Sequence, residues 1–401
     1  MSKLKKTIDI DVYSASKKRI EYVFNNFERV YLSFSGGKDS TTMFHVVAEV
    51  AQKMNKRFGV LIIDLEAQYK ATIENMRAMV DEYSHMIDLH WVCLPIKLRN
   101  AVSNFQPTWC CWDGEKRDKW VRNPPECAIT DSDYYPFFVD RMEFEEFMVL
   151  WGDWYANGKT CAGLVGIRAD ESLNRFRTIA SSKKSMHNNH RWTTQVVDGL
   201  YNAYPIYDWK TSDIWAYHAK FPHKRHNEIY DLMHKAGLTP HQMRLCQPYG
   251  DDQKRGLWLY QILEPETWGL VLARVAGANS GAKYVTESGN ITGHMKIEKP
   301  AGHTWKSFCN LLLATMPAVT RDHYLPVFRS WLRRWQERGY YTEIPDEAPR
   351  ELENKKWVPS WRRLCKVLLR NDWWCKGLGL TQPKSEAYAK FLEIKKSKKE
   401  T

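Results

Sequence analysis

The chain has 401 residues, with 59 Lys and Arg against 47 Asp and Glu, so its net charge is +12 at pH 7. This length allows one large domain or two, with an ample hydrophobic core. There is no run of 18 apolar residues, so we expect no membrane span, and the basic N-terminus lacks the apolar stretch of a secretory signal. The nine cysteines are spread through a large chain, which favours reduced thiols and a cytoplasmic protein.

The first part of the chain predicts alternating helices and strands. Residues 1–28 are expected to form a leading helix, followed by a buried strand at Val30–Phe34 and a second helix. A strand at Gly59–Asp64, a helix at about 70–83 and a strand at 87–94 come next. Because strands and helices alternate, we predict an α/β fold with a doubly wound, mostly parallel sheet.

The remaining elements of this sheet are predicted after an irregular stretch. Residues 100–140 are rich in Trp, Pro and Cys and indicate no regular element. A helix is expected at about 142–155, a strand at Cys161–Ile167 and a polar loop at 181–198. A further helix begins near Thr211, where Thr, Ser and Asp can cap it.

The loop after the first strand is the most informative segment of the chain. It reads Ser35-Gly36-Gly37-Lys38-Asp39-Ser40 and leads into the first turns of a helix. A loop in this position points backbone N–H groups and the positive end of a helix at an anion. The two glycines allow a tight turn and the close approach of a ligand. The loop therefore predicts a pyrophosphate or sulfate site, the alternative being a turn of small residues without a ligand.

The sequence SGGKDS after a strand resembles the PP-loop of the adenine nucleotide alpha-hydrolase superfamily. This superfamily includes N-type ATP pyrophosphatases, tRNA-thiolating enzymes and phosphoadenosine phosphosulfate (PAPS) reductases. The Walker pattern is different, because it has four residues between its first Gly and its Gly-Lys pair. The resemblance implies the fold of that superfamily and the binding of ATP or a related adenine nucleotide by Ser35–Ser40.

Two further segments resemble PAPS reductase-like proteins. Gly166–Ser172 resembles their G-x-R-x-x-E-S motif, and Asp64 matches the Asp of an Asp-Thr-Gly turn in which Leu and Glu here replace Thr and Gly. The carboxyl ends of parallel strands meet at one edge of a sheet, so we expect Arg168, Glu171 and Asp64 beside the loop. Arg168 would bind phosphate, and Glu171 would either orient Arg168 or help to hold a divalent cation. The alternative for Arg168 and Glu171 is an ordinary surface ion pair.

The cysteines indicate an incomplete metal site at most. Cys110-Cys111 resembles the family's Cys-Cys segment, and Cys246 falls where iron–sulfur members have a Cys-x-x-Cys pair, but the last position here is Tyr249. A [4Fe–4S] cluster usually takes four thiolates, so we predict no complete cluster. If a cluster or zinc is bound, Cys110, Cys111 and Cys246 are its candidate ligands, and ordinary buried cysteines are the simpler alternative. The catalytic Glu-Cys-Gly motif of assimilatory PAPS reductases is missing, which disfavours PAPS reduction.

The last quarter of the chain is basic and rich in tryptophan. Residues 301–401 hold 20 Lys and Arg against 11 Asp and Glu. We predict three parts: an N-terminal helix at 1–28, a PP-loop nucleotide-binding domain at 29–300, and a helical C-terminal region at 301–401. The segments Trp331–Trp335 and Trp361–Arg363 place rings beside guanidiniums, which suits nucleic acid; the alternative is a helical subdomain with a tryptophan core.

In overall layout the chain resembles the PAPS reductase-like proteins of enterobacteria and their prophages, including the immunoglobulin-binding regulator A type. Such proteins are typically encoded beside a ParB-like partner, so the resemblance implies a possible ParB-like partner.

The leading hypothesis for function is an enzyme that cleaves ATP between its alpha and beta phosphates, adenylylates an acceptor and releases pyrophosphate. Lys38, Asp39, Arg168 and Glu171 would be the catalytic residues, with Mg²⁺ held by Asp39, alone or together with Glu171. One alternative is a sulfonucleotide reductase or sulfur transferase that uses cysteine. Another is a regulatory nucleic-acid-binding protein that senses a nucleotide and acts with the ParB-like partner.

Overall fold

A computed structural model of the chain gives the fold. It describes residues 9–240, 242–251, 256–257, 259–278, 298–340 and 343–381. None of the described helices is both long and apolar enough to cross a membrane. The predicted divisions after residues 28 and 300 stay predictions, and residues 1–8 and 382–401 lie outside the described residues.

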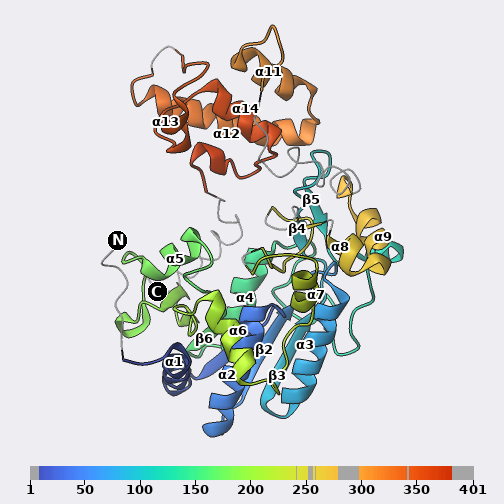
Figure 1. The fold of residues 1–401 in the computed structure, drawn as a ribbon, viewed down its shortest axis with the longest axis vertical. Coiled ribbons are helices and arrows are strands. Elements are labelled where there is room, and N and C mark those ends of the chain that lie inside the picture. The colour runs from blue at the N-terminus through green and yellow to red at the C-terminus, as the bar shows by residue number, and fades with distance from the viewer. Residues whose placement is uncertain are drawn as a thin grey trace.

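A six-stranded sheet with the strand order β3-β2-β1-β6-β8-β7 forms the centre of the molecule (Figure 1). All neighbouring strands are parallel except β7, which is antiparallel to β8. The mostly parallel α/β sheet predicted from the alternating pattern is therefore confirmed. The strands are β1 (Arg29–Ser33), β2 (Phe58–Ile63), β3 (Ile87–Val92), β6 (Cys161–Val165), β7 (Thr193–Val197) and β8 (Leu200–Ala203), with a separate pair, β4 (Lys97–Arg99) and β5 (Thr108–Cys110).

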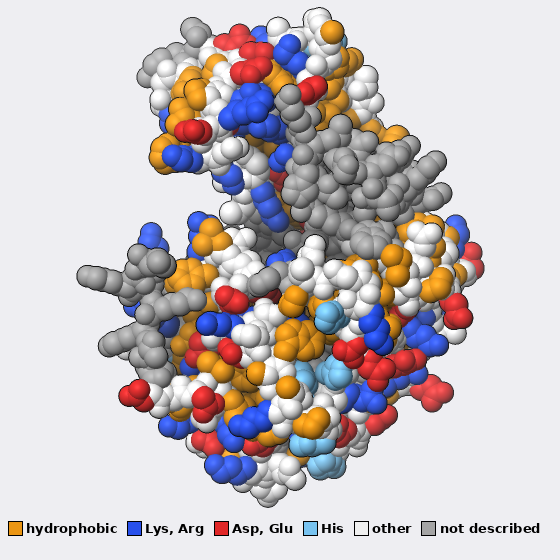
Figure 2. Space-filling model, viewed as in Figure 1, with side chains coloured by type: hydrophobic (Ala, Val, Ile, Leu, Met, Phe, Trp, Pro, Cys, Tyr) orange, Lys and Arg blue, Asp and Glu red, His pale blue; other side chains and the backbone are white. Residues whose placement is uncertain are grey.

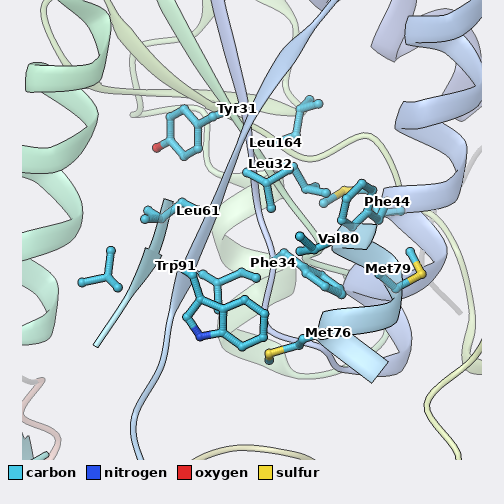
Figure 3. Packing of buried hydrophobic residues seen from close by; sticks show 14 of the residues in the cluster. Tyr31, Leu32, Phe34, Phe44, Leu61, Met76, Met79, Val80, Trp91 and Leu164 are labelled. Atoms are coloured by element: carbon cyan, nitrogen blue, oxygen red, sulfur yellow. The ribbon is translucent and has the colours of Figure 1, made fainter. Parts of the chain in front are cut away.

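Helices cover both faces of the sheet. Tyr31 and Leu32 of β1 point to opposite sides (Figure 3). The ring of Tyr31 lies 4.9 Å from that of Trp151 in α4, while on the other face Phe34 packs 5.0 Å from Phe44 in α2. Burial on both faces explains why the strand segments are continuously apolar. The helices of this lobe are α1 (Val12–Asn26), α2 (Lys38–Lys53), α3 (Lys70–Tyr83), α4 (Phe144–Ala156), α5 (Leu173–Ala180), α6 (Thr211–Lys220), α7 (Ile229–Lys235), α8 (Leu259–Leu263) and α9 (Pro265–Arg274).

The segment expected to be a polar loop at 181–198 differs from that prediction. Its second half is strand β7, which turns back into β8 as a hairpin at the end of the sheet. The turn is Asp198-Gly199, and Gly199 has φ +73°. An Asp-Gly pair between two short β-prone runs is a hairpin signal, so the sequence held the information that could have predicted it.

The C-terminal lobe, residues 305–380, contains a second hydrophobic core (Figure 1). Trp305, Tyr324, Phe328 and Trp331 are buried in it. The expectation of a helical C-terminal region is met by the described residues. The helices of the C-terminal lobe are α11 (Trp305–Thr315), α12 (Ala318–Gln336), α13 (Arg350–Asn354) and α14 (Trp361–Leu369).

The two lobes meet at the β4–β5 pair. Asn371 donates from Nδ2 to the carbonyl of Ala101 at 3.2 Å and accepts at Oδ1 from Nη2 of Arg99 at 3.2 Å. The guanidinium of Arg99 also lies over the ring of Trp373, 4.6 Å from its centroid. Polar and cation–π contacts thus join the C-terminal lobe to the hairpin that carries Cys110.

Candidate nucleotide site

The candidate site lies where the strand order reverses. β1 pairs with β2 on one side and with β6 on the other, and both neighbours are parallel to it. The loops that follow β1 and β6 therefore leave the same edge of the sheet at its topological switch point, where ligands of such sheets bind. These loops carry the two predicted segments, Ser35–Ser40 and Gly166–Ser172.

The backbone of the first loop is built around its glycines. Gly36 has φ +70°, and a Cβ at this position would lie 2.6 Å from Cε of Met76, so only glycine fits without strain. Gly37 is the N-cap of α2 and has no side chain with which to cap it, and among the first N–H groups of the helix that of Lys38 donates to the hydroxyl of Tyr230. The hydroxyls of Ser35 and Ser40 lie 3.0 Å apart. A helix start without a side-chain cap leaves backbone N–H groups for an anion.

Lys38, Asp39 and Arg168 form one charged cluster at this helix start. Nε of Arg168 donates to Oδ1 of Asp39 at 2.6 Å, and Nζ of Lys38 lies 3.3 Å from Oδ2 of the same carboxylate. Lys38 and Arg168 are both buried, with 8% and 1% of their surface exposed. The cluster thus places two cations beside the loop, with the Asp39 carboxylate between them and the Asp170 carboxylate 4.0 Å from Nη1 of Arg168. The predicted proximity of Arg168 to the loop agrees with this geometry.

Arg168 keeps one donor unused. Its Nη1 is buried and makes no hydrogen bond with the described residues, and the Asp170 carboxylate with which it pairs is 4.0 Å away. A buried guanidinium N–H without an acceptor is costly, and a phosphate or sulfate oxygen would satisfy it. This atom is the strongest sign that the site receives an anion.

The Glu171 carboxylate pairs with Arg175 rather than with Arg168. Its Oε2 pairs with Nη1 of Arg175 at 2.6 Å, and its carbonyl accepts from Nη2 of Arg244 at 3.4 Å. Both oxygens of Asp39 are likewise engaged by cations. No group of three metal-ligating side chains exists among the described residues. Both carboxylates are thus paired with cations, and the holding of Mg²⁺ by them stays a prediction.

Two residues that the sequence argument missed hold the loop in place. Nδ2 of Asn227 donates to the carbonyl of Gly36 at 2.9 Å and to Oγ1 of Thr72 at 3.0 Å. The hydroxyl of Tyr230 accepts from the N–H of Lys38 at 3.0 Å, and burial raises the pKa of this phenol. Asn227 and Tyr230 belong to the segment around α7, about 190 positions after the loop in the sequence. No local sequence pattern could therefore point to them.

Asp64 has a structural environment at the same edge of the sheet. This fully buried carboxylate accepts from Nε1 of Trp91 at 2.9 Å and pairs with Arg122. The next turn residue, Glu66, has φ +65°, a conformation that favours glycine. Glu66 is held by Nε and Nη2 of Arg274 at 2.5 and 2.9 Å. Glu66, which stands where the family's Asp-Thr-Gly turn has Gly, is therefore stabilised by a buried, bidentate ion pair with Arg274.

The cysteines are not arranged as metal ligands. Cys110 and Cys111 are buried, and the thiol of Cys111 points to the carbonyls of Leu94 and Ile96, 3.6 and 3.5 Å away. Burial raises the pKa of Cys110 to about 12 and raises that of Cys111 as well. The ring of Tyr249 packs 5.0 Å from that of Trp109, next to Cys110. The thiols of Cys110 and Cys111 are thus directed at backbone carbonyls, and the expectation of no complete cluster stays a prediction.

In the C-terminal lobe, the interpretation of Arg362 and Arg363 as phosphate contacts is wrong. Both are buried, with 7% and 3% of their surface exposed. Arg362 binds the carboxylates of Glu353 and Glu347 at 3.0 and 2.7 Å, and Arg363 lies over the ring of buried Trp331. These guanidiniums stabilise the core of the lobe. Arg329, Arg333 and Arg334 of α12 are exposed.

The PAPS reductase domain model matches residues 29–237, which is just over half of the chain and includes both loops of the site. The chain belongs to the PAPS reductase domain family. A second model, a domain of unknown function (DUF3440), matches residues 237–341 and 340–389 of this family member. The uncharacterized protein YbdN of Escherichia coli (strain K12) is 40% identical over 403 residues, covering 100% of this chain and 98% of the relative.

Solved structures are similar to this PAPS reductase-family chain only at a distance. The PAPS reductase of Candida auris, in a phosphate complex, has a TM-score of 0.32 and 13% identity, covering 57% of this chain and 95% of that one. The FMN adenylyltransferase of Candida glabrata has a TM-score of 0.32 and 12% identity, covering 57% of this chain and 62% of its own. The U34-tRNA thiolase NcsA of Methanococcus maripaludis, with its [4Fe-4S] cluster, has a TM-score of 0.32 and 9% identity, covering 70% of this chain and 80% of its own. TM-scores this low indicate a distant similarity and give no information about the site.

Proposed function

We propose that the loop Ser35–Ser40 binds the phosphates of ATP or a related adenine nucleotide, and that the protein transfers the adenylyl group to an acceptor. The observation that carries this proposal is Nη1 of Arg168, a buried donor without a hydrogen bond among the described residues, beside a helix start whose N-cap is glycine. The family match adds support, because the matched residues include this loop and Arg168.

In the proposed reaction, a nucleophilic oxygen of the acceptor attacks the alpha phosphorus. The bond from this phosphorus to the bridging oxygen breaks, and pyrophosphate leaves with the electron pair while the acceptor's proton passes to water. Lys38, the loop amides and Nη1 of Arg168 would stabilise the negative charge that develops on the departing pyrophosphate. Asp39 would keep the two cations in place through its ion pairs at 3.3 and 2.6 Å. Glu171 would act only through its neighbours.

The test is nucleotide binding by paired variants. Lys38→Ala together with Asp39→Ala should weaken ATP binding about 100-fold in calorimetry, because charge-assisted hydrogen bonds contribute about 1.5–3 kcal/mol each. Arg168→Lys keeps the charge and loses the second donor, and should weaken binding about tenfold. Lys56→Ala removes an exposed cation outside the site and should change nothing. Unchanged binding in both site variants, with the fold verified by thermal unfolding, would refute the site.

Measurements of turnover distinguish two other functions from the proposed adenylyl transfer. A cysteine-dependent sulfur transferase or reductase is disfavoured by the burial of Cys110 and Cys111, since a thiol with a raised pKa is a poor nucleophile; Cys246, in contrast, is exposed. Activity that is lost on replacing Cys246 would favour it. A nucleotide sensor would bind ATP without releasing pyrophosphate. Such a regulator would act with a ParB-like partner or with nucleic acid through the exposed arginines of α12, in the manner of the immunoglobulin-binding regulator A type.

A further inference from the structure

A long segment beside the site carries positive charge only. Residues 173–197 contain five Lys and Arg and no Asp or Glu, and they run from α5 through β7. Arg177, Lys183 and Arg191 are exposed, and no acidic side chain pairs with them among the described residues. An exposed run of unpaired cations is the electrostatic footprint of an anionic partner.

The backbone of this segment is fixed in place by its neighbours. Nζ of Lys184 donates to the carbonyls of Thr178 and Arg191, at 2.8 and 2.6 Å. One ammonium group thus bridges the backbone of α5 at Thr178 and the backbone of the following loop at Arg191. Arg177, which precedes Thr178, and Arg191 are thereby held on the same part of the surface. The hydroxyl of Tyr22 in α1 contacts Nδ1 of His187 at 2.8 Å. The cations therefore stand on a segment that is hydrogen-bonded within itself and to α1.

A chain of contacts connects this surface to the proposed nucleotide site. Nζ of Lys38 lies 3.4 Å from the carbonyl of Met243, and the next residue, Arg244, reaches the carbonyl of Glu171. The Glu171 carboxylate in turn pairs with Arg175 in the first turn of α5. A partner lying on the segment would therefore have one end near the loop. α5 lies at the edge of its lobe that faces the C-terminal lobe, and Lys and Arg side chains are seen on both walls of the notch between the lobes (Figures 1 and 2).

The composition of the surface favours nucleic acid over an acidic protein. Protein interfaces usually have an apolar, aromatic-rich centre that is depleted of charge. Here Leu173 is the large apolar side chain that is exposed, at 62%, whereas Asn174, Asn188 and Asn189 offer exposed amides among the cations. Polar and strongly positive surfaces of this kind are typical of nucleic-acid binding.

We propose that residues 173–197 bind the phosphodiester backbone of a nucleic acid and bring that strand to the nucleotide site as the acceptor. The binding surface stands on its own evidence, while the acceptor role rests on the proposed adenylyl transfer. DNA and RNA share the phosphodiester backbone, so both strands belong in the test.

The test measures the affinity of fluorescein-labelled single-stranded DNA and RNA 20-mers against salt concentration, without ATP. The triple variant Arg177→Ala, Lys183→Ala, Arg191→Ala should bind about 10- to 100-fold more weakly near 0.1 M salt. Its log–log salt slope should be flatter by about 2, since each lost phosphate contact on a single strand contributes about 0.7. A stronger effect with DNA or with RNA identifies the strand type. The control triple variant Lys56→Ala, Lys159→Ala, Lys235→Ala removes the same charge from other exposed positions and should bind as the wild type.

Several results would overturn the proposed surface. Equal loss in the control variant would mean that only net charge matters. A loss confined to an Arg333→Ala, Arg334→Ala variant would move the strand to α12. Tighter binding of a poly-glutamate peptide than of either 20-mer would indicate an acidic protein.

The acceptor role has a separate readout. The 20-mer should stimulate pyrophosphate release by the wild type and not by the triple variant, whose ATP affinity should be unchanged. If ATP does not bind to the wild type, the proposed function fails while strand binding is still tested. If ATP binds and the strand binds without stimulating release, only the acceptor role fails.

Discussion

Removal of the Arg274 guanidinium should destabilise the sheet-containing lobe strongly. Glu66 is fully buried, and Arg274 is 5% exposed. The guanidinium supplies two of the hydrogen bonds to this carboxylate, at 2.5 and 2.9 Å. Arg274→Met keeps most of the stem volume but leaves Glu66 with the N–H groups of Trp112 and Val121. Breaking one side of a buried ion pair costs about 3–5 kcal/mol, so we expect a loss of that size in the free energy of unfolding.

A double variant tests whether the pair is the cause. Glu66→Gly removes the carboxylate and suits the φ of +65° at this turn. Combined with Arg274→Met, it should be about 2–3 kcal/mol more stable than the sum of the two single changes, because neither buried charge is then left unpaired.

The assay is urea unfolding followed by tryptophan fluorescence, with Arg77→Met as the matched control on an exposed helix position. The control should stay within about 0.5 kcal/mol of the wild type. A loss below about 1 kcal/mol for Arg274→Met, or strictly additive effects in the double variant, would refute the reasoning.

Three further predictions concern stability. Burial lowers the pKa of His45 and of His218 to about 4, so both imidazoles are neutral in the folded protein near pH 6.5. The unfolded chain takes up protons at these residues first as the pH falls, and the folded state therefore has its full stability only above pH 6.5. This stability, up to about 3 kcal/mol for each, should be lost as the pH falls from 6.5 towards 4, and urea midpoints at a series of pH values will measure it; midpoints that do not change would contradict it. Gly36→Ala should lower the melting temperature, because the new Cβ would meet Met76 at 2.6 Å with φ at +70°, whereas Gly37→Ala, whose Cβ would be 3.4 Å from Tyr230, should not; equal effects would refute the packing argument. Arg362→Ala should destabilise the C-terminal lobe by about 2 kcal/mol in urea unfolding, and Arg333→Ala should not, because only the first removes a guanidinium at 3.0 Å from the buried Glu353 carboxylate and leaves it with the more distant Lys366 ammonium at 3.6 Å; a neutral Arg362→Ala would contradict this.

The sequence alone predicted the sheet and the loop because both depend on local patterns. Continuous apolar runs form strands that are buried on both faces, and Gly36 supplies the positive φ that the turn requires. The parallel arrangement then implied that Arg168 would lie beside the loop, and its contact with Asp39 at 2.6 Å agrees. The β7–β8 hairpin was predictable too, from Asp198-Gly199.

What only the tertiary structure decided is which polar groups find partners. The support of the loop by Asn227 and the pairing of Glu66 with Arg274 join residues about 190 and 208 positions apart, and no local pattern encodes such distances. Charge composition likewise could not tell buried Arg362 from exposed Arg333, although the two stand in similar basic, Trp-rich segments. A guanidinium is buried when a carboxylate and carbonyls surround it, and the packing of distant elements alone determines where those acceptors lie.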